Sequence, residues 1–182
     1  MTPNQIISKA REYLGVTGNP KGSHNVPFNT EYYGYQVNDR NAYYWCVVFV
    51  WYVFKAAGAS ALFCNGDKAN RCATVKTWAT SAGLTIDKAN IRPGDLVLFD
   101  WEPNGTPDHI GIVTSAATNG TFTTIEGNVD DSVKEQSRNL SKVILAIRPE
   151  YAQEGGVPDT LLELLRPLYE ALEPLYRPYN QK

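Results

Sequence analysis

The sequence predicts an α+β fold in which helices come first and an antiparallel sheet follows. Helix start and stop signals and one strongly apolar run fill the first half of the chain, whereas short β-branched runs separated by turn residues dominate from residue 95 onward. Asn119-Gly120, the strongest short hairpin signal, stands between two of these runs. With 182 residues, 43% of them hydrophobic, the chain can bury one sizeable core, which we expect over residues 1–150.

The N-terminal segment predicts a helix that packs on one side of this core. Thr2 and Gln5 have the spacing of a capping box around Pro3, and Gly15 ends the apolar pattern. Residues 19–41 are rich in Gly, Asn and Tyr without a clear period, which is typical of a long loop that shapes a neighbouring site. We expect His24, inside this loop, to be solvent-exposed.

Cys46 begins the next predicted helix, within an apolar run over residues 44–54. A helix that is hydrophobic all round must be buried. The partial positive charge of its N-terminus favours a thiolate, and its free N–H groups can bind an oxyanion. Buried cysteines are also often inert packing residues, so the run alone leaves a nucleophile and a structural thiol both open.

His109 opens one of the predicted strands, and its neighbours suggest a partner for Cys46. A further short helix is expected over 74–82, and strands over 95–101, 110–115, 121–126 and 143–148. A two-residue turn at Asn119-Gly120 would pair position 113 with 126 and 111 with 128, which puts His109, Glu126 and Asn128 on one face. In that register Asn128 is the nearer partner of His109, and Glu126 reaches it only across a bulge or a longer loop.

A thiol on a buried helix, a histidine on a strand and a polar residue on the next strand form the triad of a papain-like hydrolase. The imidazole removes the thiol proton and later protonates the leaving amine. A carboxylate or amide on the other ring nitrogen fixes the tautomer and the orientation of the ring.

Four blocks follow one another along the chain: Trp45-Cys46 with Phe49-Val50-x-Tyr52, then Arg92 to Phe99, Asp108 to Val113, and Ile125 to Asn128. Together they resemble CHAP domains, the cysteine- and histidine-dependent amidohydrolases and peptidases that cut bacterial peptidoglycan. The resemblance covers roughly residues 3–149 and implies a papain-like α+β fold with Cys46 as nucleophile and His109 as base. It assigns the orienting role to Glu126, with Asn128 beside it, and we therefore expect a loop longer than two residues.

The residue before the nucleophile departs from the family pattern. CHAP domains often place Gln or a small residue there, whereas this chain has Trp45. The second oxyanion donor, beside the Cys46 backbone N–H, therefore needs another source. Asn41 and Tyr43 are the candidates.

The resemblance implies a peptidoglycan hydrolase that cuts an amide bond, as an N-acetylmuramoyl-L-alanine amidase or a peptide endopeptidase, through an acyl-enzyme. The alternatives are a non-catalytic cell-wall-binding or scaffold domain and an acyltransferase with the same triad. A net charge of −2 excludes a basic stripe for nucleic acid, and no segment has the length of a membrane span. Residues 1–5 show no signal-peptide pattern, so we expect action on the bacterial wall after phage-type release or as a trimmed secreted protein.

We expect no required cofactor. The stretch from Asp100 to Asp108 resembles the front half of a calcium loop, but Gly111 stands where the twelfth-position Glu belongs. An acidic hairpin loop is the preferred interpretation, and a structural calcium ion is the weaker one. Cys64 and Cys72 could form a disulfide if oxidised, but we favour two reduced thiols, one packed and one exposed.

After a linker over 151–157, residues 158–182 form a predicted Leu/Pro-rich helical tail. Its leucines repeat at alternating spacings of four and three, but Pro167 and Pro174 must kink any helix. The tail is either a docking or self-associating segment or a leash to a wall-binding module.

Overall fold

The structure is a computed structural model that describes residues 1–152 and 165–168. The chain divides into two units, Met1–Tyr151 and Ala152–Lys182. In the second unit the described part is a single helical turn over residues 165–168, with Leu165 and Leu168 exposed. Residues 153–157 of the expected linker and most of the expected tail lie outside the described residues, so self-association stays a prediction.

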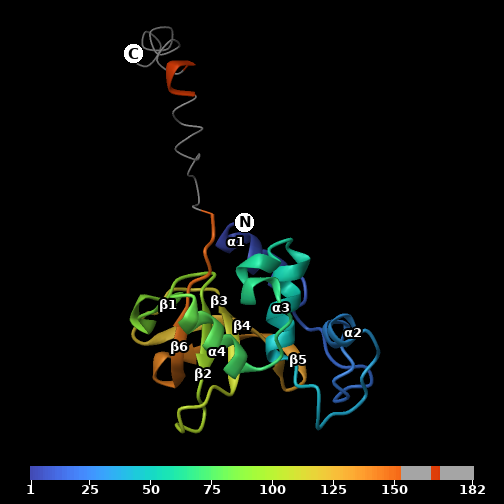
Figure 1. Ribbon diagram of the computed structural model, residues 1–182. Helices are drawn as coiled ribbons and strands as arrows, with labels where there is room; N and C mark the ends of the chain where they lie inside the picture. Colours follow the sequence, from blue (N-terminus) through green and yellow to red (C-terminus); the bar gives the residue numbers. More distant parts are fainter. Residues whose placement is uncertain (153–164, 169–182) are drawn as a thin grey trace, which may run out of the picture. The chain divides into compact units, whose positions relative to one another are not determined.

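Four α-helices precede the whole sheet in the chain (Figure 1). The Thr2–Gln5 capping box is confirmed, because each side chain bonds the other residue's backbone N–H. One helix lies inside the segment expected to be a loop; it was missed because it is only seven residues long, although Pro27 starts it and the left-handed Gly34 ends it. The helices are α1 (Pro3–Arg11), α2 (Pro27–Tyr33), α3 (Cys46–Ala56) and α4 (Cys72–Ser81).

Six antiparallel strands form one sheet in the order β1-β6-β2-β3-β4-β5, which confirms the α+β class. Two strands were not predicted. β1 has only two residues, and β5 is so polar that of its residues only Val133 is buried. The strands are β1 (Thr85–Ile86), β2 (Leu96–Phe99), β3 (His109–Val113), β4 (Thr121–Val129), β5 (Ser132–Asn139) and β6 (Val143–Ile147).

The buried helix α3 is the centre of the core. It packs against β3 and β4, and α1 and α2 pack against α3 (Figure 1). Along β2, Leu96 and Leu98 belong to the large cluster that includes the helices, whereas Val97 and Phe99 belong to a smaller second cluster. A Cβ on Gly127 of β4 would stand 2.5 Å from the Phe49 Cβ, so only glycine lets β4 approach α3 this closely.

The hairpin between β3 and β4 differs from the expected register. Thr118 pairs with Thr121 in an isolated bridge around Asn119-Gly120, but β3 ends at Val113 and β4 begins at Thr121. The connection between the two strands therefore spans residues 114–120 and is longer than two residues, as expected. Val113, however, pairs with Thr124 rather than with position 126. Between these two pairs, the segment after β3 contributes residues 114–117 and β4 only residues 122–123. This bulge shifts the register by two residues.

The segment between α1 and α3 is held in place by buried polar contacts. The expectation that His24 is exposed is wrong: it is buried, and its Nδ1 lies 2.6 Å from the carbonyl oxygen of Ala42. Asn29 donates to the carbonyl oxygens of both His24 and Tyr43, at 2.9 Å each. These bonds fix the backbone that enters α3.

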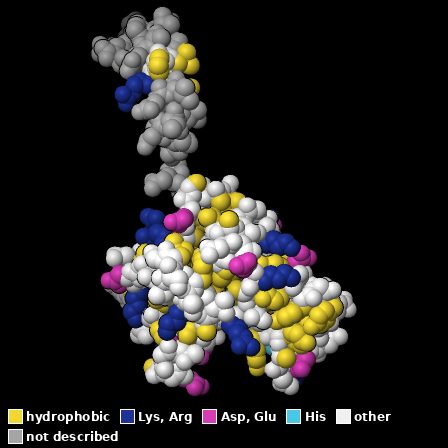
Figure 2. Space-filling view, in the orientation of Figure 1, with side chains coloured by type: hydrophobic (Ala, Val, Ile, Leu, Met, Phe, Trp, Pro, Cys, Tyr) yellow, Lys and Arg dark blue, Asp and Glu magenta, His cyan; other side chains and the backbone are white. Residues whose placement is uncertain are grey.

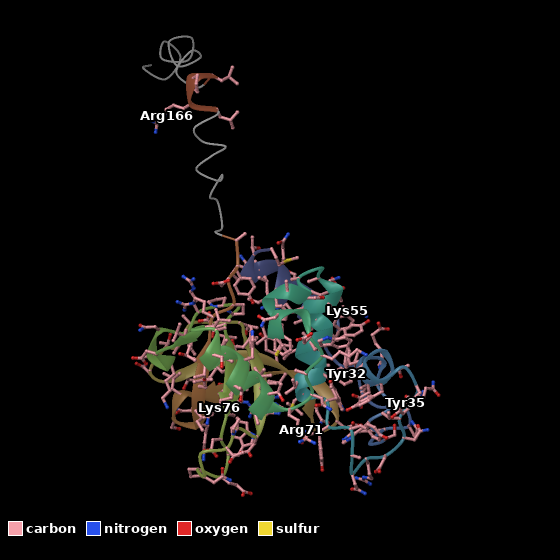
Figure 3. All side chains as sticks on the ribbon, viewed as in Figure 1. Tyr32, Tyr35, Lys55, Arg71, Lys76 and Arg166 are labelled. Carbon is pink, nitrogen blue, oxygen red and sulfur yellow. The ribbon has the colours of Figure 1, made fainter. Side chains whose placement is uncertain are left out.

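Aromatic side chains connect α2 to α3 and reach the surface. Tyr32 packs against Trp51, with ring centroids 5.1 Å apart, and Figure 3 shows Tyr32 between the two helices, with Lys55 also on this side of α3. Tyr35 and Tyr44 are exposed, and Figure 2 shows hydrophobic side chains gathered over α2. Elsewhere on that face, charges of both signs are interspersed. Within the described residues, no helix is long and apolar enough to cross a bilayer.

Candidate active site

The thiol of Cys46 stands on the first residue of α3, where backbone N–H groups have no partner in the helix. The side chain is buried, with 8% of the residue exposed. Cys72, the first residue of α4, places a second buried thiol within hydrogen-bonding reach of Cys46. Two helix N-termini therefore converge on one sulfur, which sequence spacing could not indicate.

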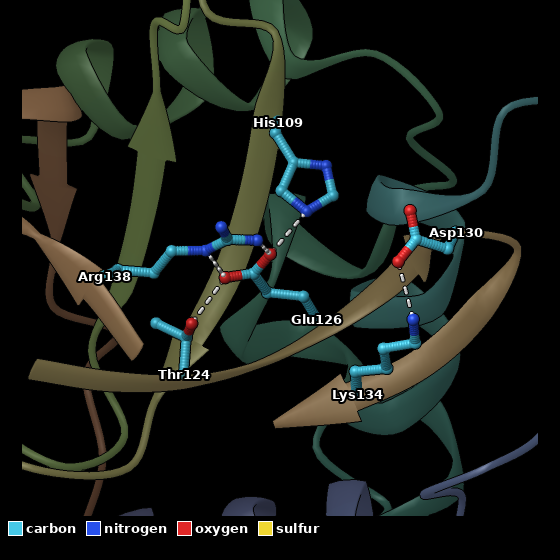
Figure 4. Close-up of polar contacts among 6 residues, drawn as sticks. All are labelled: His109, Thr124, Glu126, Asp130, Lys134 and Arg138. Carbon is cyan, nitrogen blue, oxygen red and sulfur yellow. Dashed lines mark hydrogen bonds and ion pairs between the residues drawn. The ribbon is translucent and has the colours of Figure 1, made fainter. Parts of the chain in front are cut away.

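His109 and Glu126 are brought into direct contact. The Nε2 atom of His109 lies 2.8 Å from Oε2 of Glu126 (Figure 4). Because Nε2 is occupied in this way, Nδ1 is the ring nitrogen that remains for Cys46, which also hydrogen-bonds this histidine. The ring is held between a sulfur on one side and a carboxylate on the other.

Glu126 is completely buried, and four donors surround its carboxylate. Oε1 accepts from the hydroxyl of Thr124 at 2.5 Å and from Nε of Arg138 at 2.7 Å. Oε2 accepts from Nη2 of Arg138 at 2.5 Å and from His109. Each oxygen thus has two partners, which is the arrangement that a buried ionised carboxylate needs. Figure 4 shows Arg138 reaching this carboxylate from β5.

Gly111 makes the contact between His109 and Glu126 possible. It lies on β3, two residues after His109, and continuation of the register places it opposite Glu126. A Cβ at this position would stand 3.0 Å from Cγ of Glu126 and 3.0 Å from Cβ of Thr124. The missing side chain leaves the space that the Glu126 side chain occupies.

Asn128 does not take the place that the expected register gave it. The two-residue shift moves Glu126 into the diagonal position next to His109, and the Nε2 partner is Glu126. Asn128 instead lies where the pairing of β4 with β5 changes register, with a left-handed φ of 63°. The geometric choice of Asn128 over Glu126 is therefore wrong.

The two candidate oxyanion donors lie in the segment before α3. The backbone N–H of Asn41 donates to Oδ1 of Asp39 at 2.8 Å, and its side chain is exposed. Tyr43 has a φ of 58°, and its ring meets that of Tyr33 with centroids 5.0 Å apart. Their role as donors stays a prediction.

Charge in the site favours a thiolate and an imidazolium. The hydrogen bond from Cys72, together with His109 and the Val47 N–H, holds the pKa of Cys46 well below its usual range although burial opposes this. Burial lowers the pKa of His109, but the hydrogen bonds to Cys46 and Glu126 outweigh it and raise that pKa to about 9. Burial likewise raises the pKa of Glu126, and the hydrogen bonds from Arg138 and His109 outweigh it, so the pKa falls to about 2.

The other two thiols are reduced, as expected, but neither is exposed. All three cysteines are free and buried, so the expectation of one exposed thiol among Cys64 and Cys72 is wrong. Burial raises the pKa of Cys64 to about 12. Hydrogen bonding to Cys46 and burial both raise the pKa of Cys72, so this thiol keeps its proton and donates it to its neighbour.

The acidic loop before β3 uses its oxygens within the loop. Asp100 accepts from the backbone N–H groups of Asn104 and Gly105, at 3.3 and 2.8 Å. Asp108 accepts from the Trp101 N–H at 2.8 Å. Among the described residues, no group of three or more His, Cys, Asp or Glu side chains could hold a metal ion.

A model of the CHAP domain family matches residues 38–128, half of the chain, and this range contains Cys46, His109 and Glu126. The chain belongs to the CHAP domain family. This membership confirms the resemblance and the papain-like α+β fold class.

Two solved structures are similar to this CHAP domain protein. The crystal structure of Ly7917 has a TM-score of 0.47 and 14% sequence identity, and covers 82% of this chain and 63% of its own. The crystal structure of Ly7917 with the hydrolyzing product of MDP has a TM-score of 0.46 and 16% identity, over 84% of this chain and 64% of its own. The chain thus spans less than two thirds of these proteins. No curated protein sequence matches it.

The thiolate predicts an unusual pH dependence for alkylation of Cys46. Iodoacetamide should modify this thiol at nearly the same rate at pH 6 and pH 8, whereas an ordinary thiol of pKa about 8.5 slows by about 75-fold between these values. His109→Ala should slow the reaction and make it more dependent on pH, because one of the groups that stabilise the thiolate is removed. The rates are measured by mass spectrometry of the Cys46 peptide, and the same peptide in denatured protein is the matched control. Identical profiles in the native and denatured protein would contradict the thiolate.

Proposed function

We propose that this CHAP domain hydrolyses an amide bond of bacterial peptidoglycan through an acyl-enzyme on Cys46. The observation that carries the proposal is the continuous hydrogen-bonded series from the Cys46 thiol through His109 to the buried carboxylate of Glu126. Family membership supports the substrate class. The bond is either the N-acetylmuramoyl-L-alanine amide or a peptide bond of the stem or cross-bridge.

In the proposed mechanism the Cys46 thiolate attacks the amide carbonyl carbon. The oxyanion forms against the Cys46 backbone N–H at the start of α3, while the imidazolium of His109 gives its Nδ1 proton to the leaving amine. The C–N bond breaks and leaves a thioester on Cys46. His109, now neutral, removes a proton from water; the resulting hydroxide attacks the thioester, releases the carboxylic acid and restores the thiolate.

Glu126 keeps the His109 ring oriented throughout this cycle. Its hydrogen bond from Nε2 fixes the tautomer in which Nδ1 faces Cys46 when the ring is neutral. We assign Asn128 no contact with the ring, and we propose a supporting role for it in shaping the strand end beside Glu126.

Cys46→Ala separates an enzyme from a wall-binding or scaffold domain. We expect release of new amino groups from purified peptidoglycan to fall at least about 1,000-fold, because the nucleophile is removed, while sedimentation with the wall is unchanged. Cys64→Ala, a buried thiol outside the site, is the matched control and should keep full activity. Unchanged hydrolysis in Cys46→Ala would refute the mechanism.

Mass spectrometry of the muropeptides released by the parent protein then identifies the bond that is cut. A product in which the acyl group is joined to an added amine, instead of being released as an acid, would indicate an acyltransferase.

We also propose that activity requires no calcium. The support is that Asp100 and Asp108 already accept backbone N–H donors of their own loop. Hydrolysis should therefore proceed at an unchanged rate in excess EDTA. Loss of activity that calcium alone restores would contradict this, whereas a lower Tm with activity retained would point to a structural ion.

A further inference from the structure

Arg138 is the second cation at the Glu126 carboxylate, and neither the family resemblance nor the proposed mechanism uses it. It lies on β5, opposite Phe122 of β4, and its guanidinium bridges both carboxylate oxygens of Glu126, with Nε on Oε1 at 2.7 Å and Nη2 on Oε2 at 2.5 Å. This is the planar, two-pronged geometry that only arginine provides. Figure 4 shows the guanidinium and the His109 ring both reaching the Glu126 carboxylate.

The guanidinium is itself held in place. It lies 4.9 Å from the ring centroid of Trp101 and 5.7 Å from that of Phe99, and these two rings stack at 4.8 Å. Phe99 also stacks on His109, with centroids 6.1 Å apart. One aromatic stack therefore supports both the arginine and the histidine that bind Glu126.

A second cation is needed because His109 loses its charge during the proposed cycle. When the imidazolium protonates the leaving amine, Glu126 remains a fully buried carboxylate beside a neutral ring. A buried carboxylate without a counter-charge takes up a proton instead. A guanidinium group is always charged in proteins, so Arg138 supplies a positive charge in both halves of the cycle.

We propose that Arg138 is a positioning residue of this site: it keeps Glu126 ionised and fixed while His109 is neutral, so that Glu126 can orient the base for the attack of water. This role rests on the proposed function. It also predicts an effect on the resting enzyme, because Glu126 in turn stabilises the imidazolium that faces Cys46.

The other charged groups around Glu126 cannot take over this role. Lys134 is the strand partner of Glu126 on β5, but its ammonium pairs with Asp130 at 2.6 Å, and Asp130 is largely exposed (Figure 4). Cys46 on α3 faces His109, and Cys72 on α4 faces Cys46; neither thiol carries a positive charge. Asp108 acts on Cys72 as a negative charge. Arg138 is thus the permanent cation of the described site.

The test compares Arg138→Gln with Lys134→Gln, which removes a cation from the same strand. Alkylation of Cys46 by iodoacetamide is followed from pH 5 to pH 8, without any substrate. We expect a nearly flat profile in the parent protein and in Lys134→Gln. In Arg138→Gln we expect the rate to fall about 10-fold towards pH 5, because Glu126 takes up a proton and no longer stabilises the imidazolium. Arg138→Lys, which keeps the charge but loses the fork, should lie between the two.

Two further variants, Glu126→Gln and the double variant Glu126→Gln with Arg138→Gln, distinguish a positioning role of Arg138 from a merely structural one. They also test the proposal if Arg138→Gln alone does not fold. In Glu126→Gln the carboxylate is gone, so adding Arg138→Gln should slow neither alkylation nor hydrolysis further. This double variant replaces both charges by neutral amides, which leaves no buried unpaired ion. Two results would overturn the proposal. One is a flat alkylation profile in folded Arg138→Gln. The other is that Arg138→Gln lowers the rates in the Glu126→Gln background as much as it does in the parent protein.

Hydrolysis of peptidoglycan provides the second readout. We expect kcat of Arg138→Gln to fall about 10- to 100-fold at pH 7 with KM unchanged within about twofold, since no substrate contact is removed. If peptidoglycan is not hydrolysed even by the parent protein, the proposed function fails, but the alkylation profiles still decide the role of Arg138.

Discussion

The site depends on one buried negative charge. Glu126 has no exposed surface, and an isolated carboxylate in such a place would take up a proton. Two donors on each oxygen keep it ionised, and removal of one partner from a buried pair of this kind typically costs about 3–5 kcal/mol. His109 on β3, Thr124 on β4 and Arg138 on β5 must therefore be aligned at once, which ties the chemistry to the register of three strands.

That register has a local cause. The bulge over residues 114–117 moves β4 by two positions relative to β3, so that Glu126 lies opposite Gly111 and beside His109. Gly111 leaves room for the carboxylate to pass, and Gly127, the next residue after Glu126, lets the same strand lie close to α3. The two glycines on neighbouring strands thus place a charged side chain within reach of the base while the backbone stays packed against the nucleophile helix.

The sequence was informative where periodicity and capping act locally. The capping box of α1, the buried helix after Cys46, four of the six strands and the turn at Asn119-Gly120 all follow from local patterns. The bulge carries no turn signal, since residues 114–117 are Thr, Ser, Ala and Ala. A prediction that paired β3 with β4 without a bulge therefore chose Asn128 as the partner of His109. The family resemblance pointed to Glu126 instead.

Residues contributed by distant elements were not predictable in this way. β5 has one apolar residue, Val133, so its sequence lacks the alternation of apolar and polar residues that indicates a strand. Arg138, which lies on this strand, was therefore not predicted as a site residue. In the sequence, Arg138 is simply one charged residue in a polar segment, and nothing there points to Glu126 as its partner. Cys72 was considered as a partner of Cys64, whereas the fold brings it to Cys46 because the N-termini of α3 and α4 converge. Such convergence is a property of tertiary packing and leaves no local pattern.

The central claim is that the buried carboxylate holds His109 as an imidazolium at neutral pH. The most direct test is an NMR titration of the His109 ring nitrogens in ¹⁵N-labelled protein, with His24→Gln as the variant that assigns the second histidine. If the carboxylate has this effect, both ring nitrogens of His109 stay protonated at pH 7, and the ring loses a proton only near the raised pKa of about 9. A His109 ring that is already neutral at pH 7 would contradict this claim.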